Sequence, residues 1–391
     1  MAFRTIFAKQ FKNAVVFHSV FFRDSTTDHW VETDLVVMME DVLLIVEAKA
    51  GVMAMHSPAT DFDRHMGAVE RLIVGAYKQC KRFVEYMGSS STVPIYELCD
   101  GNYLKISDIR LCDFKTVLPV GLTVESLAPF SSCVHQLEGI TPLIGKHAFM
   151  SMSVDDLLLL NRFLPTTGEL IHYLEVRQAA GAIPDTILFD EMEYLGAYIV
   201  RNRFDTDLKK QQIETSFVLW NSYADVVDKY FEGEEWGKEP VPQQKYPDEL
   251  EAVLRVLEKK RPMAWLEMDS AIRNLNGEQR ENLSKGIVAL KNTLKRHRHR
   301  RMLMFNGMPI QVWVCRTGLE PSERVLRHHA EVACIIANAV TTRVLRLSYN
   351  KKKKIRNVDC RSYPHPARER KDYAVLKREA LTERARSMNI E

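Results

Sequence analysis

Two short apolar runs near the N-terminus have the length and composition of buried β-strands. Leu35–Met39 and Val42–Val46 are rich in β-branched and aliphatic side chains, and the polar dipeptide Glu40-Asp41 separates them. Strands of this length that are joined by a short polar turn form an antiparallel hairpin. The pattern therefore predicts a hairpin, with a further strand before it over Ala14–Phe22.

A long amphipathic helix is predicted over Arg64–Met87. Apolar residues recur there at intervals of three and four, which is the spacing of one face of an α-helix. Another strand-like region, Ile109–Val124, follows, and Ala2–Lys12 has helical spacing at the start of the chain. The predicted order is thus helix, three strands, helix and strand. The apolar stripe of the long helix consists of Ala68, Leu72, Ala76, Cys80, Phe83 and Met87.

Beyond residue 150 the spacing becomes that of helices, predicted over residues 155–160, 169–179 and 191–201. Glu232–Pro242, which is acidic and contains two glycines and two prolines, is the predicted linker. The last third is predicted to be α+β, with Asn306-Gly307 as a hairpin turn. Its helices are expected over 247–260, 264–275, 277–295 and 321–339, and its strands over 302–305, 310–315 and 342–347.

With 391 residues, the chain is longer than one typical domain. We predict a domain over residues 1–150, a helical extension over 151–232, and a mainly helical α+β C-terminal domain over 245–391. The seven cysteines include no C-x-x-C pair, which excludes a zinc ribbon and indicates free thiols. No signal-peptide core and no membrane-length apolar run is found, so the expected location is the cytoplasm, without membrane contact.

The predicted hairpin carries charged residues where its strands end. Asp34 begins the first strand, and the second strand runs into Glu47-Ala48-Lys49. Side chains alternate along a strand, so Glu47 and Lys49 point to the same face. Two carboxylates and an ammonium group at the end of an apolar sheet are costly to desolvate unless something binds them. A divalent cation would satisfy this requirement.

This pattern resembles the PD-(D/E)XK nuclease superfamily, and within it the nuclease-related-domain group of bacterial proteins. In this family an Asp, a spacer and a Glu-x-Lys form the metal site, and Asp34 and Glu47-Ala48-Lys49 match these positions. A Gln on the following helix is a further family feature, matched by Gln79. The resemblance covers about the first third of the chain. It implies an α/β restriction-endonuclease-like core, in which helices flank a central mixed sheet.

The resemblance also implies a mechanism. Mg²⁺, which Mn²⁺ can replace, would be held by Asp34, Glu47 and the Ala48 carbonyl, since hard cations take oxygen ligands. Lys49 would position the attacking water and offset negative charge, with Gln79 in support. Many family members carry a further metal-binding Glu on the first helix, but residues 3–13 contain no acid. Glu32 is the expected substitute.

Basic residues are concentrated late in the chain, although the net charge is only +3. Clusters of this kind neutralise phosphates and give nucleic-acid affinity that falls with salt. We expect a nucleic-acid-binding surface, with a solvated helix end or a docking face for a protein partner or second copy as alternatives. The residues concerned are Lys291, Lys295, Arg296, Arg298, Arg300, Arg301, Lys351, Lys352, Lys353, Lys354 and Arg356.

The predicted function is Mg²⁺-dependent hydrolysis of nucleic acid, as a DNA endonuclease that would suit bacterial defence against phages or plasmids. The alternative is a catalytically silent nucleic-acid-binding or scaffold protein with the same fold. No Gly-rich phosphate loop of an ATPase and no serine nucleophile elbow is present. His328-His329 is interpreted as structural, because adjacent residues of a helix do not face each other.

Overall fold

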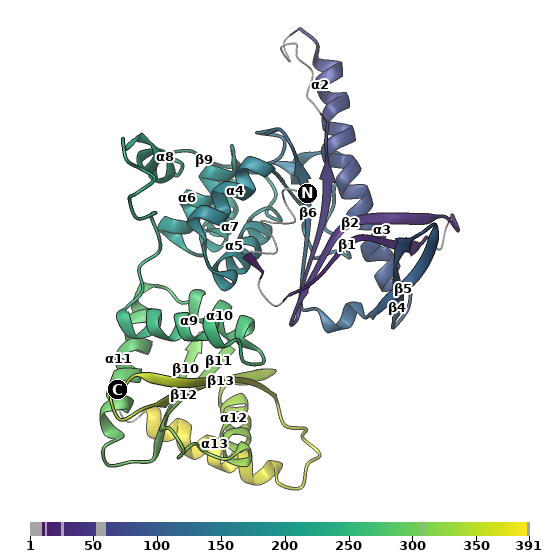
Figure 1. Ribbon diagram of the computed structural model, residues 1–391. Coiled ribbons are helices and arrows are strands. Elements are labelled where there is room, and N and C mark those ends of the chain that lie inside the picture. Colours follow the sequence, from purple (N-terminus) through teal and green to yellow (C-terminus); the bar gives the residue numbers. More distant parts are fainter. Residues whose placement is uncertain (1–9, 12–13, 25–26, 52–59, 307, 389–391) are drawn as a thin grey trace. The chain divides into compact units, whose positions relative to one another are not determined.

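The computed structural model of the protein describes residues 10–11, 14–24, 27–51, 60–306 and 308–388. The chain divides into two compact units, Met1–Gln244 and Lys245–Glu391 (Figure 1). The first unit contains both the expected domain 1–150 and the expected helical extension 151–232. The predicted first helix, Ala2–Lys12, lies almost entirely outside the described residues.

A seven-stranded mixed sheet forms the centre of the first unit. Its strand order is β5-β4-β1-β2-β3-β6-β7. Neighbours from β5 to β3 are antiparallel, whereas β6 runs parallel to both β3 and β7. The α/β class with a large mixed sheet flanked by helices is therefore confirmed. The strands are β1 Val15–Arg23, β2 Trp30–Met39, β3 Val42–Lys49, β4 Val93–Cys99, β5 Asn102–Ile109, β6 Thr116–Thr123 and β7 Met150–Ser153.

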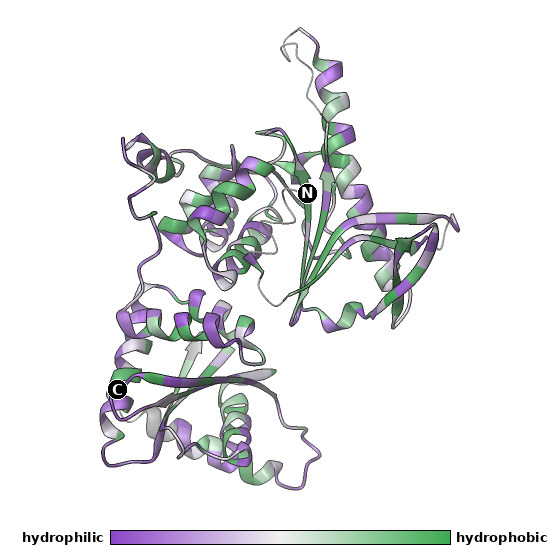
Figure 2. Cartoon of the chain, in the orientation of Figure 1, coloured by the Kyte–Doolittle hydropathy of each residue, from purple (hydrophilic) through white to green (hydrophobic). Residues whose placement is uncertain are grey.

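The predicted hairpin is the β2–β3 pair, which is confirmed. Met39 lies opposite Val42 in the antiparallel register, and Glu40 in the turn has a positive φ of 52°. Strand β3 is interior, between β2 and β6. Its residues Val42–Val46 are at most 4% exposed, and the inner strands carry mainly hydrophobic colouring in Figure 2. The apolar run thus forms the centre of the sheet because both of its faces are covered.

The long helix after β3 is confirmed, but it is not a uniform α-helix. It consists of α2 Phe62–Val69, a π-helical segment Glu70–Val74 and α3 Gly75–Gly88. Every residue of the predicted apolar stripe is buried. Steps of four residues overshoot an α-helical turn by about 0.4 residue each. The wider π turn absorbs this excess, which keeps successive members of the stripe on the sheet.

A β-hairpin that the pattern analysis missed follows α3. Strands β4 and β5 pair through Asp100-Gly101, both with positive φ. Asp-Gly is a strong hairpin dipeptide, so the turn was readable from the sequence. Much of the hairpin is exposed, and its strands therefore lack a long apolar run. The predicted strand region Ile109–Val124 contains only the end of β5, a short 3-10 turn and β6.

Helices complete the first unit on the side of β6 and β7 (Figure 1). The Gln178 amide of α5 donates to the carbonyls of Val117 and Ala148, both at 2.9 Å, and this ties α5 to the sheet. The three helices predicted here are confirmed as α4, α5 and α6, and two more follow. Their bounds are α4 Val154–Phe163, α5 Thr167–Ala180, α6 Glu191–Arg201, α7 Phe204–Thr215 and α8 Asp225–Glu232, with the short paired strands β8 Thr186–Leu188 and β9 Val218–Trp220.

The second unit is a four-stranded sheet between two layers of helices. The strand order is β10-β11-β12-β13, and only the β11–β12 pair is parallel. Helices α9 to α11 pack on one face and α12 with α13 on the other (Figure 1). The elements are α9 Asp248–Lys260, α10 Trp265–Arg273, α11 Gly277–Thr293, β10 His299–Asn306, β11 Met308–Arg316, α12 Glu323–Ala337, β12 Thr341–Tyr349, β13 Ile355–Pro364 and α13 Tyr373–Met388.

Two expectations for this unit were incomplete. Strands β10 and β11 both begin earlier and end later than predicted. Arg300 and Arg301 therefore lie in strand β10. Strand β13 and helix α13 were missed altogether. Both elements contain mostly polar and basic residues with few apolar ones between them. This is because one face of each element packs on the unit and the other face is in solvent. Asn306-Gly307 joins β10 to β11 as expected, although Gly307 itself lies outside the described residues.

Candidate active site

The four expected catalytic residues meet where β2 and β3 separate. The β2–β3 ladder ends at the pair Leu35–Val46, one residue before Asp34 and Glu47. From there β3 continues beside β6 alone, with Glu47 opposite Gly121 and Lys49 opposite Thr123. The last three residues of β3 are therefore free of one neighbouring strand, and this opens a position for polar side chains at the end of an apolar sheet.

The Asp34 side chain supplies a hydrogen bond at the point where the backbone pairing of β2 with β3 has ended. Its Oδ2 atom accepts a hydrogen bond of 2.7 Å from the backbone N–H of Ala48. This bond fixes the half-buried carboxylate beside Glu47 and leaves the other oxygen, Oδ1, available. Without it, the Ala48 N–H would lose its partner at the point where the strands diverge.

Glu47 is the most unusual side chain of the site. It is 0% exposed, and neither of its carboxylate oxygens has a hydrogen-bond partner among the described residues. Burial, followed by the negative charge of Asp34, raises the pKa of Glu47 to about 8. Lys49 partly offsets this rise in the pKa. The Thr33 hydroxyl also lowers the pKa, but its geometry falls outside that of a hydrogen bond, so the carboxylate stays unsatisfied.

Lys49 is held by the long helix. Its ammonium group donates a hydrogen bond to the side-chain oxygen of Gln79, which lies on α3. Cys80, the next residue of α3, is fully buried, and its pKa is raised by burial and by the charge of Glu47. The helix thus supplies both the apolar cover of the site and the amide that orients the ammonium group.

Two residues that sequence reasoning missed shape the site. Gly121 of β6 lies beside Glu47, and a β-carbon there would come within 2.6 Å of the Phe149 ring and 3.1 Å of the Ala76 β-carbon. Only glycine lets α3 approach the sheet this closely. The fully buried Thr33 hydroxyl is the second. The position of Gly121 inside an apolar strand was a signal that sequence reasoning could have used. Nothing in the sequence pointed to a role for Thr33.

Glu32, the expected substitute for an acidic residue of the first helix, lies elsewhere. It is exposed and pairs in register with Phe21, whose ring packs on Tyr103. The neighbouring Thr33 instead pairs with Val20, which belongs to the core under α3. Glu32 therefore points away from the face that α3 covers, and its charge makes the smallest contribution to the raised pKa of Glu47.

The donor set suits a hard divalent cation. Asp34 and Glu47 bring two carboxylates together in a buried place, and the unpartnered oxygens of Glu47 need a ligand when the group is charged. A hard cation with oxygen ligands provides this, and Mg²⁺ commonly binds through one or two carboxylates while keeping several waters. The Ala48 carbonyl belongs to the same strand end.

Replacing Glu47 by glutamine should remove a pH-dependent loss of stability. The pKa of this carboxyl is 4.5 ordinarily and about 8 in the folded chain. Between these values the unfolded chain has released a proton that the folded chain keeps, so the free energy of unfolding falls as pH rises and levels off above the window. In EDTA, the free energy of unfolding of the wild type should fall across this pH window by on the order of a few kcal/mol more than that of Glu47→Gln.

Urea unfolding of both proteins at several pH values across this window measures the difference. Asp63→Asn, an exposed acidic residue of α2, is a matched control that should follow the wild type. Parallel curves for wild type and Glu47→Gln would contradict the buried, unpartnered state of this carboxyl.

The predicted basic residues are distributed over several elements. Lys291 lies in the last turn of α11, and Lys295, Arg296 and Arg298 follow that helix. Arg300 and Arg301 lie on β10, and the run Lys351–Lys354 forms the β12–β13 turn. Two of them are neutralised by acids: Lys291 by Glu249, and Arg301 by Glu383. Five of the predicted residues line one cavity of the second unit, namely Lys291, Lys295, Lys351, Lys353 and Arg356.

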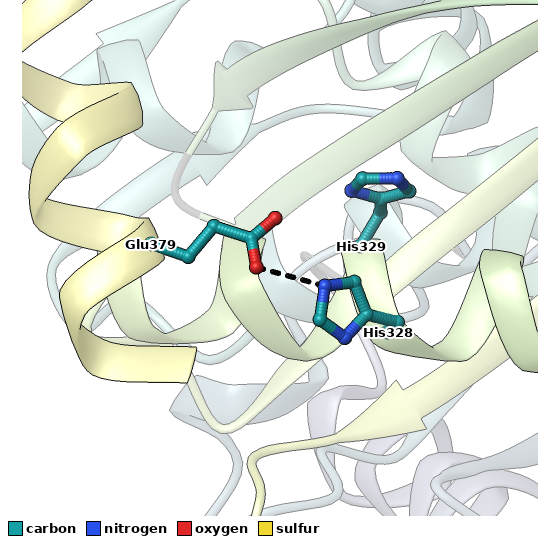
Figure 3. Close-up of side chains that lie close together, drawn as sticks. All are labelled: His328, His329 and Glu379. Atoms are coloured by element: carbon teal, nitrogen blue, oxygen red, sulfur yellow. Dashed lines mark hydrogen bonds and ion pairs between the residues drawn. The ribbon is translucent and has the colours of Figure 1, made fainter. Parts of the chain in front are cut away.

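A second group of possible metal ligands lies in the second unit. His328 and His329 of α12 and Glu379 of α13 have ligand atoms within 4.8 Å of one another (Figure 3). The expectation that neighbouring histidines point apart was wrong, because their ring centroids are 5.2 Å apart. Nε2 of His328 lies 2.9 Å from Glu379.

This group is poorly suited to a hard divalent cation, because two of its three possible ligands are imidazoles. Burial, with Arg301 as the next cause, lowers the pKa of His329 to about 4. The imidazole of His329 is therefore neutral, but the one carboxylate of this group, Glu379, already pairs with His328. Asp34 and Glu47 bring together two carboxylates, one of them buried with oxygens that lack a partner among the described residues, so their site is the stronger candidate for a hard cation.

No family model, curated protein or solved structure matches this chain significantly. Within the described part of the chain, none of the helices combines the length and the apolar character needed to cross a membrane.

Proposed function

We propose that the first unit is a Mg²⁺-dependent nuclease of the PD-(D/E)XK type, with its active site at the end of β3. Glu47 carries this proposal. A carboxylate that is 0% exposed with two unpartnered oxygens destabilises the fold unless a ligand compensates it. The large majority of buried side-chain polar atoms in proteins have a hydrogen-bond partner, so a buried glutamate with two unpartnered oxygens needs an explanation. The location of Asp34, Lys49 and Gln79 around it supports a catalytic role.

The arrangement of the first unit supports the same proposal. Three antiparallel strands, β1 to β3, are followed by the long helix and by β6, which is parallel to β3. This is the order expected for a restriction-endonuclease-like core, with the β4–β5 hairpin as an addition at the edge of the sheet. The proposed site lies at the carboxyl end of β3, beside the parallel strand β6.

Each proposed catalytic residue has a role that its position allows. Bound Mg²⁺, or Mn²⁺ in its place, would lower the pKa of a water molecule and polarise the scissile phosphate. Asp34 and Glu47 hold the cation, with the Ala48 carbonyl as the third proposed ligand. Lys49 orients the attacking water and stabilises the negative charge that develops on the phosphate. Gln79 is a positioning residue, because it acts through its hydrogen bond to Lys49.

A catalytically silent nucleic-acid-binding protein is the second candidate function. One observation favours it: Glu32 is exposed and directed away from α3, so the described residues supply only two carboxylates to the site. Such a protein would bind nucleic acid without cutting it.

Incubating the full chain with nucleic acids separates the two candidates. We expect cleavage of DNA in Mg²⁺ or Mn²⁺ and none in EDTA. Circular and linear duplexes distinguish endonuclease from exonuclease activity, and single-stranded DNA and RNA define the substrate class. Cleavage of circular DNA would fit a role in defence against phages or plasmids. Binding without cleavage of any of the four substrates, in either metal, would favour the silent protein.

A further inference from the structure

The second unit contains a cavity with a strongly cationic lining. Its volume is about 750 Å³, within the range of small-molecule sites. Four segments meet there: the end of α11, the residues after β11, the end of β12 and the β12–β13 turn. Its cationic lining residues are Lys291, Lys295, Arg316, Lys351, Lys353 and Arg356.

Most of the positive charge in this cavity is uncompensated. Lys291 is paired with Glu249, a carboxylate that also accepts a 2.6 Å hydrogen bond from the Tyr349 hydroxyl. For the remaining five cations, Lys295, Arg316, Lys351, Lys353 and Arg356, the described residues offer no carboxylate within ion-pair distance. Glu249 is thus engaged by Lys291 and Tyr349, and five further cationic residues line one concave space.

Hydrogen bonds to backbone carbonyls and to a neutral side chain hold two of these cations, Arg316 and Lys353, in place. Arg316 donates to the carbonyls of Leu294 and Lys295, at 2.5 and 2.6 Å, and the Lys353 ammonium donates to Asn292 at 2.8 Å. In the β12–β13 turn, the Asn350 side chain accepts the N–H groups of residues 352 and 354. These bonds orient the cations without neutralising them, so like charges are kept together by the fold rather than by a counter-ion.

Like charges that are held close together repel one another, and a bound anion with several charges would offset this repulsion. The lining therefore favours an anionic ligand with several charges. Phosphate groups match lysine and arginine in both charge and hydrogen-bond geometry. The cavity is much larger than one phosphate ion, and Leu294 and Leu319 add apolar surface to it. A ligand with several phosphates and an apolar ring fits all of these features.

We propose that this cavity is a binding site for a small polyphosphorylated ligand of the nucleotide class. Lys295, Lys351 and Arg356 contact the phosphates, and the leucines contact the base or sugar. The site needs no Gly-rich loop, because side chains supply the positive charge. It binds its ligand independently of the proposed metal site in the first unit, so it goes beyond the nuclease function.

Calorimetric titration of the full chain with ATP tests this proposal. EDTA in the buffer prevents metal-dependent hydrolysis, so a failure here is independent of any nuclease activity. We expect saturable binding of ATP, weaker binding of pyrophosphate and none of adenosine. Lys295→Gln/Lys351→Gln should weaken ATP binding at least about tenfold, because two phosphate contacts are lost.

Lys259→Gln/Lys260→Gln is the matched control. It removes the same charge from exposed residues of α9 outside the cavity and should bind ATP within about twofold of wild type. Equal thermal stability of the two double variants excludes misfolding as the cause, since all four lysines are exposed.

Three results would overturn the proposal. One is adenosine binding as tightly as ATP, and another is an equal loss of affinity in both double variants. The third is a single-stranded oligonucleotide without terminal phosphates that binds in a Lys351-dependent way while ATP does not. The last result would make the cavity part of a surface for a nucleic-acid polymer.

Discussion

Replacing Lys49 by alanine should lower kcat for DNA cleavage by at least about 10²- to 10³-fold. The ammonium group sits at the end of β3, directed by Gln79, where it can orient water and stabilise developing charge. Removing it leaves both carboxylates in place. Mg²⁺ should therefore still raise the melting temperature of Lys49→Ala, whereas it should not raise that of Glu47→Gln. Initial cleavage rates at saturating substrate and thermal melts with and without Mg²⁺ measure the two effects.

Lys81→Ala provides the control for this variant. Lys81 lies on the same long helix as Gln79, is exposed, and forms only a loose ion pair of 3.9 Å with Glu85. Its removal should leave the cleavage rate unchanged. If Lys49→Ala cut DNA as fast as the Lys81 variant, the proposed active site would be wrong even if the protein proved to be a nuclease.

Replacing Glu191 by alanine should destabilise the first unit by about 3–5 kcal/mol. Glu191 of α6 pairs with Arg177 of α5 at 3.2 Å, and both side chains are at most 2% exposed. The guanidinium also lies over the ring of Tyr194, 3.4 Å from its centroid, and the Tyr173 hydroxyl donates to the carboxylate. Without the carboxylate, a buried positive charge would remain without its counter-ion.

Two further variants make this prediction specific. The double variant Arg177→Met/Glu191→Leu removes both charges and should be much less destabilised than Glu191→Ala. Asp108→Ala breaks an exposed pair with Lys105 in the same unit and should change stability by less than about 1 kcal/mol. Scanning calorimetry of the full chain measures all three. Equal destabilisation by Glu191→Ala and by the double variant would show that lost packing, not the unpaired charge, is responsible.

The pattern of apolar residues was sufficient for the centre of the first unit. Continuous apolar runs on either side of Glu40-Asp41 predicted the β2–β3 hairpin, and a stripe at intervals of three and four predicted the long helix, because both elements bury apolar faces. The β4–β5 hairpin and β13 were missed for the converse reason. Their strands mix buried positions with many half-buried or exposed ones, so none contains a long apolar run, and they pair across hairpins in spite of their local composition.

The candidate site was only partly predictable. The spacing of Asp34, Glu47, Lys49 and Gln79 suggested their proximity, and the structure brings Gln79 to Lys49 and Asp34 to the strand of Glu47. The separation of β2 from β3 depends on register, which no local pattern encodes. Likewise, the density of basic residues predicted a basic surface. Their gathering in one cavity depends on the β12–β13 turn returning to the end of α11.

The π-helical segment gives the long helix a place where its length can change. A π turn holds one residue more than the α-helical turn that it replaces, while the residues before and after it keep their faces. Deleting the exposed Arg71 would therefore convert Glu70–Val74 to regular α-helix and leave Gln79 directed at Lys49. Deleting one residue from the regular α-helix α3, ahead of Gln79, would instead turn one end of the helix by about 100° relative to the other. Homologous chains could thus differ by one residue in this segment and keep the same site.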